Sequence, residues 1–439
     1  MLKVIKFGGT SLASAEQFRK VAAIVREDKS RRYVVASAPG KRFSSDTKVT
    51  DLLLSCYRLH RVRENFDEPF SCIRSRFEEI CAELEIPFAF GEDFDRFYQE
   101  IKNGATEEYI ASRGEHFNAK ILAEFLQFPF LDTAEGIVFD ENGVLMEEKT
   151  NENLALLLKN HTRAVLPGFY GATEKGEVRT FSRGGSDITG SLVARAAKAD
   201  LYENWTDVSG LLMADPRIVS SPKAIECVTY RELRELSYMG ANVLHEDAIF
   251  PVRREGIPIN IRNTNDTAAT GTMIVENAEK SAGIVTGIAG KKGFGAIYIE
   301  KGMMNRELGF GRRVLEVLEN RKISFEHLPS GIDTMTVVLN RGDLVGHENE
   351  LIRELQMAVQ PDRIHLVENL CLIAVVGRGM INSPGTAARL FGALAKEKIN
   401  IRMIDQGSSE MNIIVALEEQ DYEKALKAIY AEFVPEEEN

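Results

Sequence analysis

The sequence predicts an α/β protein with a mostly parallel sheet sandwiched by helices, followed by two small α+β domains. Strand and helix signals alternate along the first 280 residues, which is typical of a parallel sheet with helices on its faces. Two predicted strands each end in a Gly-Gly turn that opens a helix. From residue 284 on, two stretches are similar at an offset of about 76 to 77 residues, so this part is an internal repeat of domain size.

The composition is that of a globular chain of two or three domains. Its 439 residues, 44% of them apolar and 27% charged, are too many for one ordinary core. The net charge of −12 argues against a general nucleic-acid-binding surface. The five cysteines form no C-x-x-C pair, and neither a leader peptide nor an 18-residue apolar run is visible, so we expect a cytoplasmic protein without membrane contact. The seven histidines lack metal-ligand spacing, so no metal site is predicted.

The first predicted strand ends in the turn Lys6-Phe7-Gly8-Gly9-Thr10-Ser11, and an amphipathic helix over residues 15–25 follows. A Gly-Gly turn between a strand and a helix directs backbone N–H groups to one point, which attracts phosphate. Lys6 would place a mobile cation over the same anion. The alternative is an ordinary tight turn beside an exposed lysine.

A second turn, Ser182-Arg183-Gly184-Gly185-Ser186-Asp187, also follows a predicted strand and opens a helix. The carboxyl ends of parallel strands meet at one edge, so the two turns are expected to hold a polyphosphate between them. Arg183 adds a fork suited to a carboxylate or phosphate. Asp187 either caps the helix or contacts a substrate amine or Mg²⁺. The sequence contains no G-x-x-x-x-G-K-[ST] P-loop and no H-R-D or D-F-G kinase set.

Residues 51–128 are predicted to be mostly helical. One helix begins near Thr50, with Thr50 or Asp51 as its N-cap. The segment Ser112-Arg113-Gly114-Glu115 precedes a separate helix over residues 118–126, which places Glu115 near a helix start.

The third motif is Trp205-Thr206-Asp207-Val208, with Asp215-Pro216-Arg217 shortly after it. Trp205 is expected in the core, with a nucleotide pocket as the alternative. In this order, the three motifs resemble the signature series of the aspartate kinases, and the repeat matches their two C-terminal ACT domains. The resemblance covers essentially the whole chain. It implies an amino-acid kinase domain over residues 1–280 and ferredoxin-like ACT domains over 281–368 and 369–439, with residues 284–288 as a candidate strand for the second.

The resemblance implies a monofunctional enzyme that uses ATP with Mg²⁺ to phosphorylate the β-carboxylate of L-aspartate, the first step of lysine, threonine and methionine biosynthesis. Lys6 and Asp187 would be catalytic. The residues implied for ATP are Lys6, Gly8, Gly9, Thr10, Ser11, Thr206, Asp207 and Arg217. Those implied for aspartate are Ser37, Thr50, Glu115, Arg183, Ser186 and Asp187, with Glu115 on the α-ammonium and Arg183 on the α-carboxylate.

Two positions depart from the family pattern. Asn242 stands where the family commonly has a lysine, and Leu212 stands where a nucleotide-contacting tyrosine is often found. Both changes bear on ATP affinity and leave the phosphate-transfer residues intact. Two alternative functions stay open: another amino-acid kinase, such as a glutamate or acetylglutamate kinase, and a catalytically silent amino-acid sensor that kept the kinase fold.

The repeated region has no catalytic constellation, so its function is either amino-acid sensing or dimerisation. The resemblance implies feedback by lysine, with threonine as a second candidate. The predicted effector turn contains Met304, Asn305, Gly309, Phe310 and Gly311, whose N–H groups would take a carboxylate. Glu326 would take the lysine ammonium. ACT modules usually pair edge to edge, which predicts a homodimer or a larger assembly.

Overall fold

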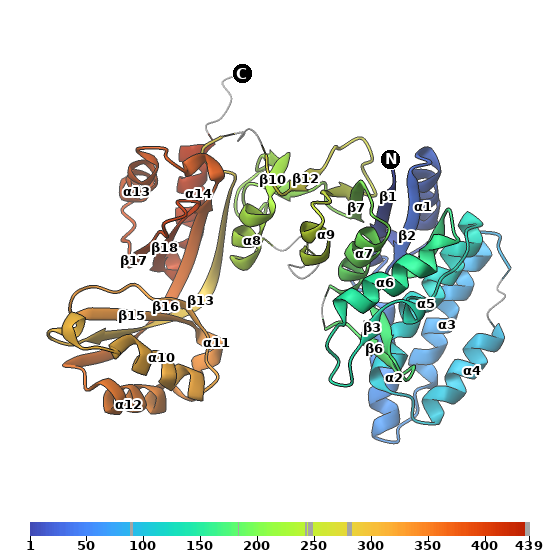
Figure 1. Cartoon of the computed structure of the whole chain (residues 1–439), viewed down its shortest axis with the longest axis horizontal. Coiled ribbons are helices and arrows are strands. Elements are labelled where there is room, and N and C mark those ends of the chain that lie inside the picture. The colour runs from blue at the N-terminus through green and yellow to red at the C-terminus, as the bar shows by residue number, and fades with distance from the viewer. Residues whose placement is uncertain (88–90, 183, 242–243, 245–248, 279–282, 435–439) are drawn as a thin grey trace. The chain divides into compact units, whose positions relative to one another are not determined.

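The computed structural model describes residues 1–87, 91–182, 184–241, 244, 249–278 and 283–434 (Figure 1). The chain divides into two compact units. The first contains residues 1–211, 226–230 and 243–278, and the second contains residues 212–225, 231–242 and 279–439. Two residues discussed above, Arg183 and Asn242, lie outside the described residues. In the described part of the chain, no helix has the length and apolar character needed to cross a membrane.

The first unit alternates strands and helices along most of its length. Its main elements are β1 (Lys3–Phe7), α1 (Ala15–Glu27), β2 (Arg31–Ala36), α2 (Val49–Arg61), α3 (Asp67–Glu83), α4 (Gly91–Lys102), α5 (Glu107–Leu126), β3 (Val138–Phe139), α6 (Glu147–Lys159), β4 (Ala164–Pro167), β5 (Tyr170–Thr173), β6 (Val178–Thr180), α7 (Gly185–Ala196), β7 (Leu201–Thr206), β10 (Cys227–Thr229), α9 (Phe250–Arg254), β11 (Ile259–Asn263) and β12 (Thr272–Val275).

Seven of these strands form one sheet, in the order β10-β12-β11-β7-β1-β2-β4. Strand β1 lies between β7 and β2 and runs parallel to both. Strand β11 is parallel to β7, and only β11 and β12 pair antiparallel to each other. The prediction of a mostly parallel sheet among helices is confirmed, and Figure 1 shows the helices of this unit around its strands. The register places Lys6 of β1 opposite Asn204 of β7.

The two faces of this sheet have different roles, because alternate residues of a strand point to opposite faces. Ile5, Phe7 and Trp205 belong to the apolar cluster that packs helices α1 to α5 against one face. Trp205 is fully buried there, so its predicted place in the core is confirmed. Lys6 and Asn204 alternate with these residues and contact Asp187, in the first turn of α7, on the other face.

One predicted N-cap and one predicted helix start are wrong. The helix predicted near Thr50 begins at Val49, as expected, but its N-cap position is Lys48, which makes no side-chain capping bond, rather than Thr50 or Asp51. Helix α5 runs unbroken from Glu107 to Leu126, so Glu115 lies in mid-helix. The earlier start is set by Thr106, whose hydroxyl accepts a hydrogen bond from the Tyr109 N–H at 3.2 Å.

The second unit contains the repeat. It includes helix α8 (Tyr230–Tyr238), apart from the first residue of that helix. Its other elements are β13 (Gly287–Glu300), α10 (Phe310–Asn320), β14 (Phe325–His327), β15 (Thr334–Asn340), α11 (Arg341–Leu344), α12 (Glu348–Val359), β16 (Arg363–Val376), α13 (Thr386–Lys396), β17 (Met403–Asp405), β18 (Asn412–Glu418) and α14 (Tyr422–Phe433). Strands β8 (Leu211–Leu212) and β9 (Ala224–Ile225) form a separate two-stranded sheet.

The two repeats share one antiparallel sheet, in the order β14-β15-β13-β16-β18-β17. Strands β13 and β16 are each 14 residues long and pass through both repeats. Residues 294–300 of β13 pair with β15, whereas residues 287–292 pair with residues 371–376 of β16. Each repeat has its own apolar cluster, so each half of the long β13–β16 ladder belongs to a different core.

Helix α8 is held to the second repeat by a buried carboxylate. Glu232 is fully buried, and its Oε2 lies 2.7 Å from Nη1 of Arg378, in the turn after β16. Its Oε1 accepts hydrogen bonds from the Arg378 N–H at 2.9 Å and from the Thr286 hydroxyl at 2.6 Å. A buried charge needs such partners, because leaving it unpaired costs several kcal/mol (about 3–5).

Candidate active site

Lys6 is a buried ammonium at the carboxyl end of the central strand. Only 7% of the residue is exposed. Its Nζ lies 2.5 Å from Asp187 Oδ1 and 3.4 Å from Asn204 Oδ1. The ammonium also lies 3.8 Å from the point where a Gly8 Cβ would stand, so it is folded back over the first turn. The alternative of an exposed lysine beside an ordinary turn is therefore wrong.

The first turn is packed too closely to accept a side chain. A Cβ on Gly9 would lie 2.8 Å from the carbonyl oxygen of Ala38, and one on Gly40 would lie 2.6 Å from the Gly9 carbonyl carbon. The Gly40 N–H donates to the Gly9 oxygen at 2.8 Å, which fixes the two turns against each other. The turns that follow β1 and β2 therefore form one rigid backbone surface at this edge of the sheet.

The second turn supplies the carboxylate that faces Lys6. Gly184 has φ 61°, a left-handed conformation that glycine adopts without strain, and α7 begins at the next residue. Asp187 is in the first turn of α7, where a carboxylate interacts favourably with the helix dipole. Among the described residues its side chain makes no capping bond and contacts Lys6 and Asn204 instead, so the capping alternative is wrong for this part of the chain.

Asn204 belongs to the site and was missed by the motif analysis. Its Nδ2 donates a hydrogen bond to Asp187 Oδ1 at 2.9 Å while its Oδ1 accepts from Lys6. The residue is 3% exposed, in the middle of strand β7. A polar amide on a buried strand, one residue before the Trp-Thr-Asp motif, was the signal in the sequence that pointed to it.

Glu115 is a second buried carboxylate, 6% exposed, on helix α5. Burial raises the pKa of Glu115 to about 8, although a hydrogen bond from the Ala38 backbone acts in the opposite direction. Among the described residues, its Oε2 has no hydrogen-bond partner. A buried acceptor without a partner at this position fits a ligand that brings a positive charge.

The remaining predicted substrate residues lie at the ends of neighbouring elements. Ser37 follows β2, and its carbonyl accepts from Asn118 Nδ2 at 2.6 Å. Thr50 is partly exposed in the first turn of α2, and Ser186 is partly exposed in that of α7. Thr10 is exposed beside the first turn.

The hydroxyl of Ser11 points into the protein. Ser11 is 2% exposed, and its Oγ lies 2.8 Å from the hydroxyl of Thr264. The side chain therefore holds the segment after the first turn in place. A phosphate would be contacted by the main-chain N–H of Ser11 rather than by its hydroxyl.

The predicted nucleotide residues are divided between the two units. Thr206 ends β7, and its hydroxyl donates to the exposed Asp207 at 3.2 Å. Arg217 belongs to the second unit, where its exposed guanidinium forms a two-point contact with Asp215, the shorter at 2.6 Å. Leu212, where a tyrosine is often found, is 37% exposed.

The predicted effector turn lies between β13 and α10. Met304 and Phe310 are buried in the core of the first repeat, so they present backbone rather than side chains at the turn. Gly309 takes a left-handed conformation, φ 76°, immediately before α10, and Gly311 is in its first turn. The Asn305 N–H donates to the Ile332 oxygen at 3.1 Å, and the carboxylate of Glu326 on β14 accepts from the Tyr238 hydroxyl.

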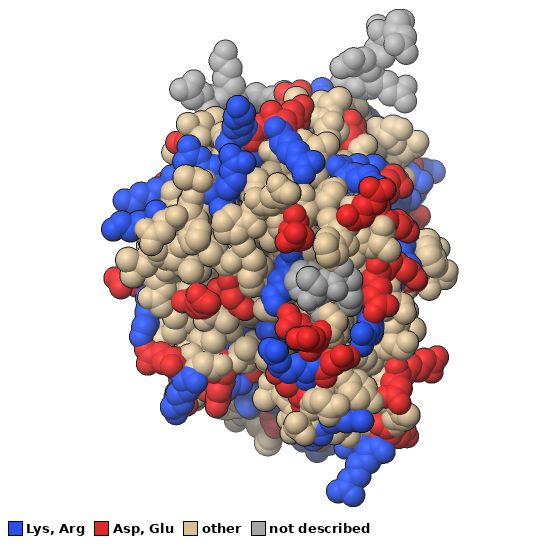
Figure 2. Space-filling model, turned by 90° about the vertical axis from the view of Figure 1, so that its right-hand side faces the viewer, with Lys and Arg blue, Asp and Glu red and all other residues tan. Residues whose placement is uncertain are grey.

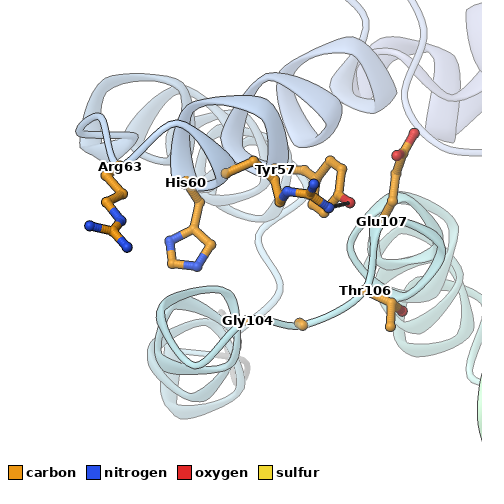
Figure 3. A pocket seen from close by; sticks show the side chains of 8 residues that line it. Tyr57, His60, Arg63, Gly104, Thr106 and Glu107 are labelled. Carbon is orange, nitrogen blue, oxygen red and sulfur yellow. Dashed lines mark hydrogen bonds between the residues drawn. The ribbon is translucent and has the colours of Figure 1, made fainter.

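A separate hollow of about 440 Å³ lies between the end of α2 and the turn from α4 to α5 (Figure 3). Tyr57 and His60 line it from α2, and Gly104, Thr106 and Glu107 line it from the turn and the start of α5. None of the predicted site residues is among those that line it. Figure 2 shows acidic and basic side chains interspersed with uncharged ones over one face of the molecule.

The raised pKa of Glu115 predicts how this residue affects stability. A carboxyl whose folded pKa is above its unfolded value stabilises fully below about pH 4.5, and that contribution is lost as the pH rises through 8. Glu115→Gln should therefore be more stable than the unsubstituted protein at pH 8, by about 4 kcal/mol, and about equally stable near pH 4.5. Urea denaturation at both pH values measures this. An equal difference at both pH values would contradict it.

Comparisons with known proteins identify relatives that match nearly the whole chain. The family model described as "Amino acid kinase family" matches residues 1–263, and that described as "ACT domain" matches residues 373–433. Aspartokinase 3 of Bacillus subtilis is 40% identical, and the alignment covers 98% of both chains. The crystal structure of aspartate kinase from Clostridium acetobutylicum has a TM-score of 0.90 at 49% identity, covering 98% of this chain and 99% of that one.

Aspartokinase III of Escherichia coli is similar at 26% identity in two crystal structures, which cover 98–99% of this chain and 99% of the other. With aspartate and ADP the TM-score is 0.78, and with lysine and aspartate it is 0.76. The family model and these full-length likenesses show that the chain belongs to the amino acid kinase family, among the aspartokinases, which are ATP-dependent phosphotransferases.

Proposed function

We propose that the first unit transfers the γ-phosphoryl group of ATP to the β-carboxylate of L-aspartate, with Lys6 and Asp187 as catalytic residues. The observation that carries the proposal is the buried Lys6 ammonium, which lies over the Gly8-Gly9 turn and contacts Asp187 at 2.5 Å. In this role the Lys6 ammonium contacts the transferring phosphoryl group, and the N–H groups of the first turn donate hydrogen bonds to the phosphates.

The chemistry requires charge neutralisation rather than a base. A β-carboxylate has an ordinary pKa of about 4 and is already ionised at neutral pH. The barrier is the approach of this anion to a polyphosphate anion, and fixed positive groups lower it by stabilising the charge on the transferring group. Lys6 supplies one such charge from a low-dielectric position, where it acts more strongly than in water.

Mg²⁺ would enter the site bound to the phosphates of the nucleotide. In the described part of the chain, no three His, Cys, Asp or Glu side chains are grouped as a metal site. Magnesium in kinases is bound mainly by phosphate oxygens and water, with one or two carboxylates, and Asp187 and Asp207 are the acids at this edge. When bound, Mg²⁺ neutralises phosphate charge. We assign the nucleotide to Gly8, Gly9, Thr10, Ser11, Thr206, Asp207 and Arg217. The E. coli relative was crystallised with ADP, which supports the binding of an adenine nucleotide.

The amino acid is recognised by its own two charges. Glu115 receives the α-ammonium, which restores the charge that burial disfavours, and Arg183 receives the α-carboxylate. Ser37, Thr50 and Ser186 line the same end of the site. An N-acetylated substrate lacks the ammonium and would leave the Glu115 carboxyl buried without its partner.

Removing the Lys6 ammonium should abolish most turnover. We expect Lys6→Ala to lower kcat by about 10²–10³, because one charge contact on the transferring group contributes roughly 3–4 kcal/mol. A coupled assay of ADP release with aspartate measures this, and circular dichroism checks the fold. Lys20→Ala is the matched control, since Lys20 is a partly exposed lysine on α1 that pairs with Glu16. A near-normal kcat in Lys6→Ala would contradict the assignment.

Loss of the Glu115 charge should affect one substrate only. Glu115→Gln keeps the shape of the side chain, so we expect KM for aspartate to rise by about 10-fold or more while KM for ATP stays within about twofold. Initial rates with each substrate varied in turn separate the two constants. Equal increases in both would show that Glu115 serves the fold alone.

We further propose that lysine, with threonine as a second candidate, inhibits the enzyme at the first repeat. The names of two relatives support this: an E. coli homologue is called lysine-sensitive, and one crystal structure contains lysine. The effector carboxylate would bind the turn of Met304, Asn305, Gly309, Phe310 and Gly311, and its ammonium would bind Glu326. We assign residues 1–280 to the kinase domain, and residues 281–368 and 369–439 to two ACT domains. We also propose that the protein assembles as a homodimer through edge strands. We expect its location to be cytoplasmic.

The effector assignment predicts a selective loss of inhibition. Glu326→Ala should raise the lysine concentration for half-inhibition by about 10-fold or more, because the ammonium loses its counter-charge. Glu316→Ala, which removes an exposed acid of α10, is the matched control. Titrations with lysine and with threonine identify the effector. Unchanged inhibition in Glu326→Ala would move the effector site elsewhere.

A further inference from the structure

We propose that Asn204 is a positioning residue for phosphoryl transfer, whose amide holds the Lys6 ammonium and the Asp187 carboxylate in one fixed arrangement. The inference rests on the proposed roles of Lys6 and Asp187. It adds a residue from strand β7 that belongs to none of the glycine turns.

The three side chains form a closed triangle. Asn204 Oδ1 accepts from Lys6 Nζ at 3.4 Å, Asn204 Nδ2 donates to Asp187 Oδ1 at 2.9 Å, and Lys6 Nζ contacts the same Oδ1 at 2.5 Å. A side-chain amide both donates and accepts without carrying charge, so it satisfies an ammonium and a carboxylate at once. Because Asn204 is 3% exposed on a central strand, its own position is fixed.

The triangle determines where the ammonium can act. A lysine ammonium has three N–H groups, and Asp187 and Asn204 take two of them, which leaves one for a phosphate oxygen. Without Asn204, the ammonium keeps a single protein partner in the triangle and the carboxylate loses the donor that holds its orientation. Both side chains then gain rotational freedom, and a displacement of about 1 Å at a reacting group lowers the rate by about 10²-fold.

Tyr202 provides a matched control on the same strand. It lies two residues before Asn204, hence on the same face, and its hydroxyl donates to the backbone oxygen of Asp187 at 3.1 Å. Tyr202→Phe therefore removes a buried hydrogen bond to the same residue without touching the carboxylate. It reports what a purely structural loss does to stability and to rate.

Two substitutions of Asn204 test the proposal in the full-length enzyme. Asn204→Leu removes both hydrogen bonds, and we expect kcat to fall by about 10- to 100-fold with a smaller change in either KM. Asn204→Asp keeps the size of the side chain and the oxygen that accepts from Lys6, but it replaces the donor to Asp187 by a second oxygen. We expect kcat of this variant to fall by about 10-fold or more as well, with a smaller change in either KM.

The readouts are kcat, both KM values and the melting temperature of each variant. A kcat of Asn204→Leu or of Asn204→Asp equal to that of Tyr202→Phe would overturn the inference. If Asn204→Leu fails to fold, kcat of Asn204→Asp decides. Absence of aspartate-dependent ADP release from the unsubstituted enzyme would overturn the proposed function as well, so the two failures are distinguishable.

Discussion

The buried contact between Lys6 and Asp187 is the constraint on which the first unit depends. The ammonium of a lysine that is only 7% exposed requires a partner, and that partner comes from a helix 181 residues further along the chain. To bring the two together, β1 must lie in the centre of the sheet, β7 must pair with it in register, and α7 must begin at the same edge. The parallel topology is therefore what assembles the site.

The closely packed glycine turns also help to assemble this site. The backbone contact between Gly9 and Gly40 leaves no room for side chains and keeps the N–H groups of the first turn at one place. A preorganised surface of this kind stabilises developing charge without rearranging during the reaction. Glu115 stands apart from it, as a buried acid whose pKa is raised by burial and whose Oε2 has no hydrogen-bond partner among the described residues.

The motifs predicted the residues that lie at strand ends and missed those defined by contacts. Lys6 and Asp187 follow from the Gly-Gly turns, because a turn and the helix after it are local features. Asn204 contacts Lys6 across 198 residues of sequence and could be placed only once the β1–β7 register was known. The helix start assigned near Glu115 failed because a capping threonine far upstream, Thr106, extends α5 through that position. The fold class was predictable, since strand and helix periodicity determine it, and the shared strands of the two repeats were not.

An aspartokinase makes an acyl phosphate on the side chain of a free α-amino acid. Hydroxylamine intercepts acyl phosphates as hydroxamates, so trapping during turnover with ATP reports the product itself. We predict ATP-dependent hydroxamate from L-aspartate and almost none from N-acetylaspartate, which lacks the ammonium assigned to Glu115. Equal hydroxamate from both compounds, or ADP release without hydroxamate, would contradict the account.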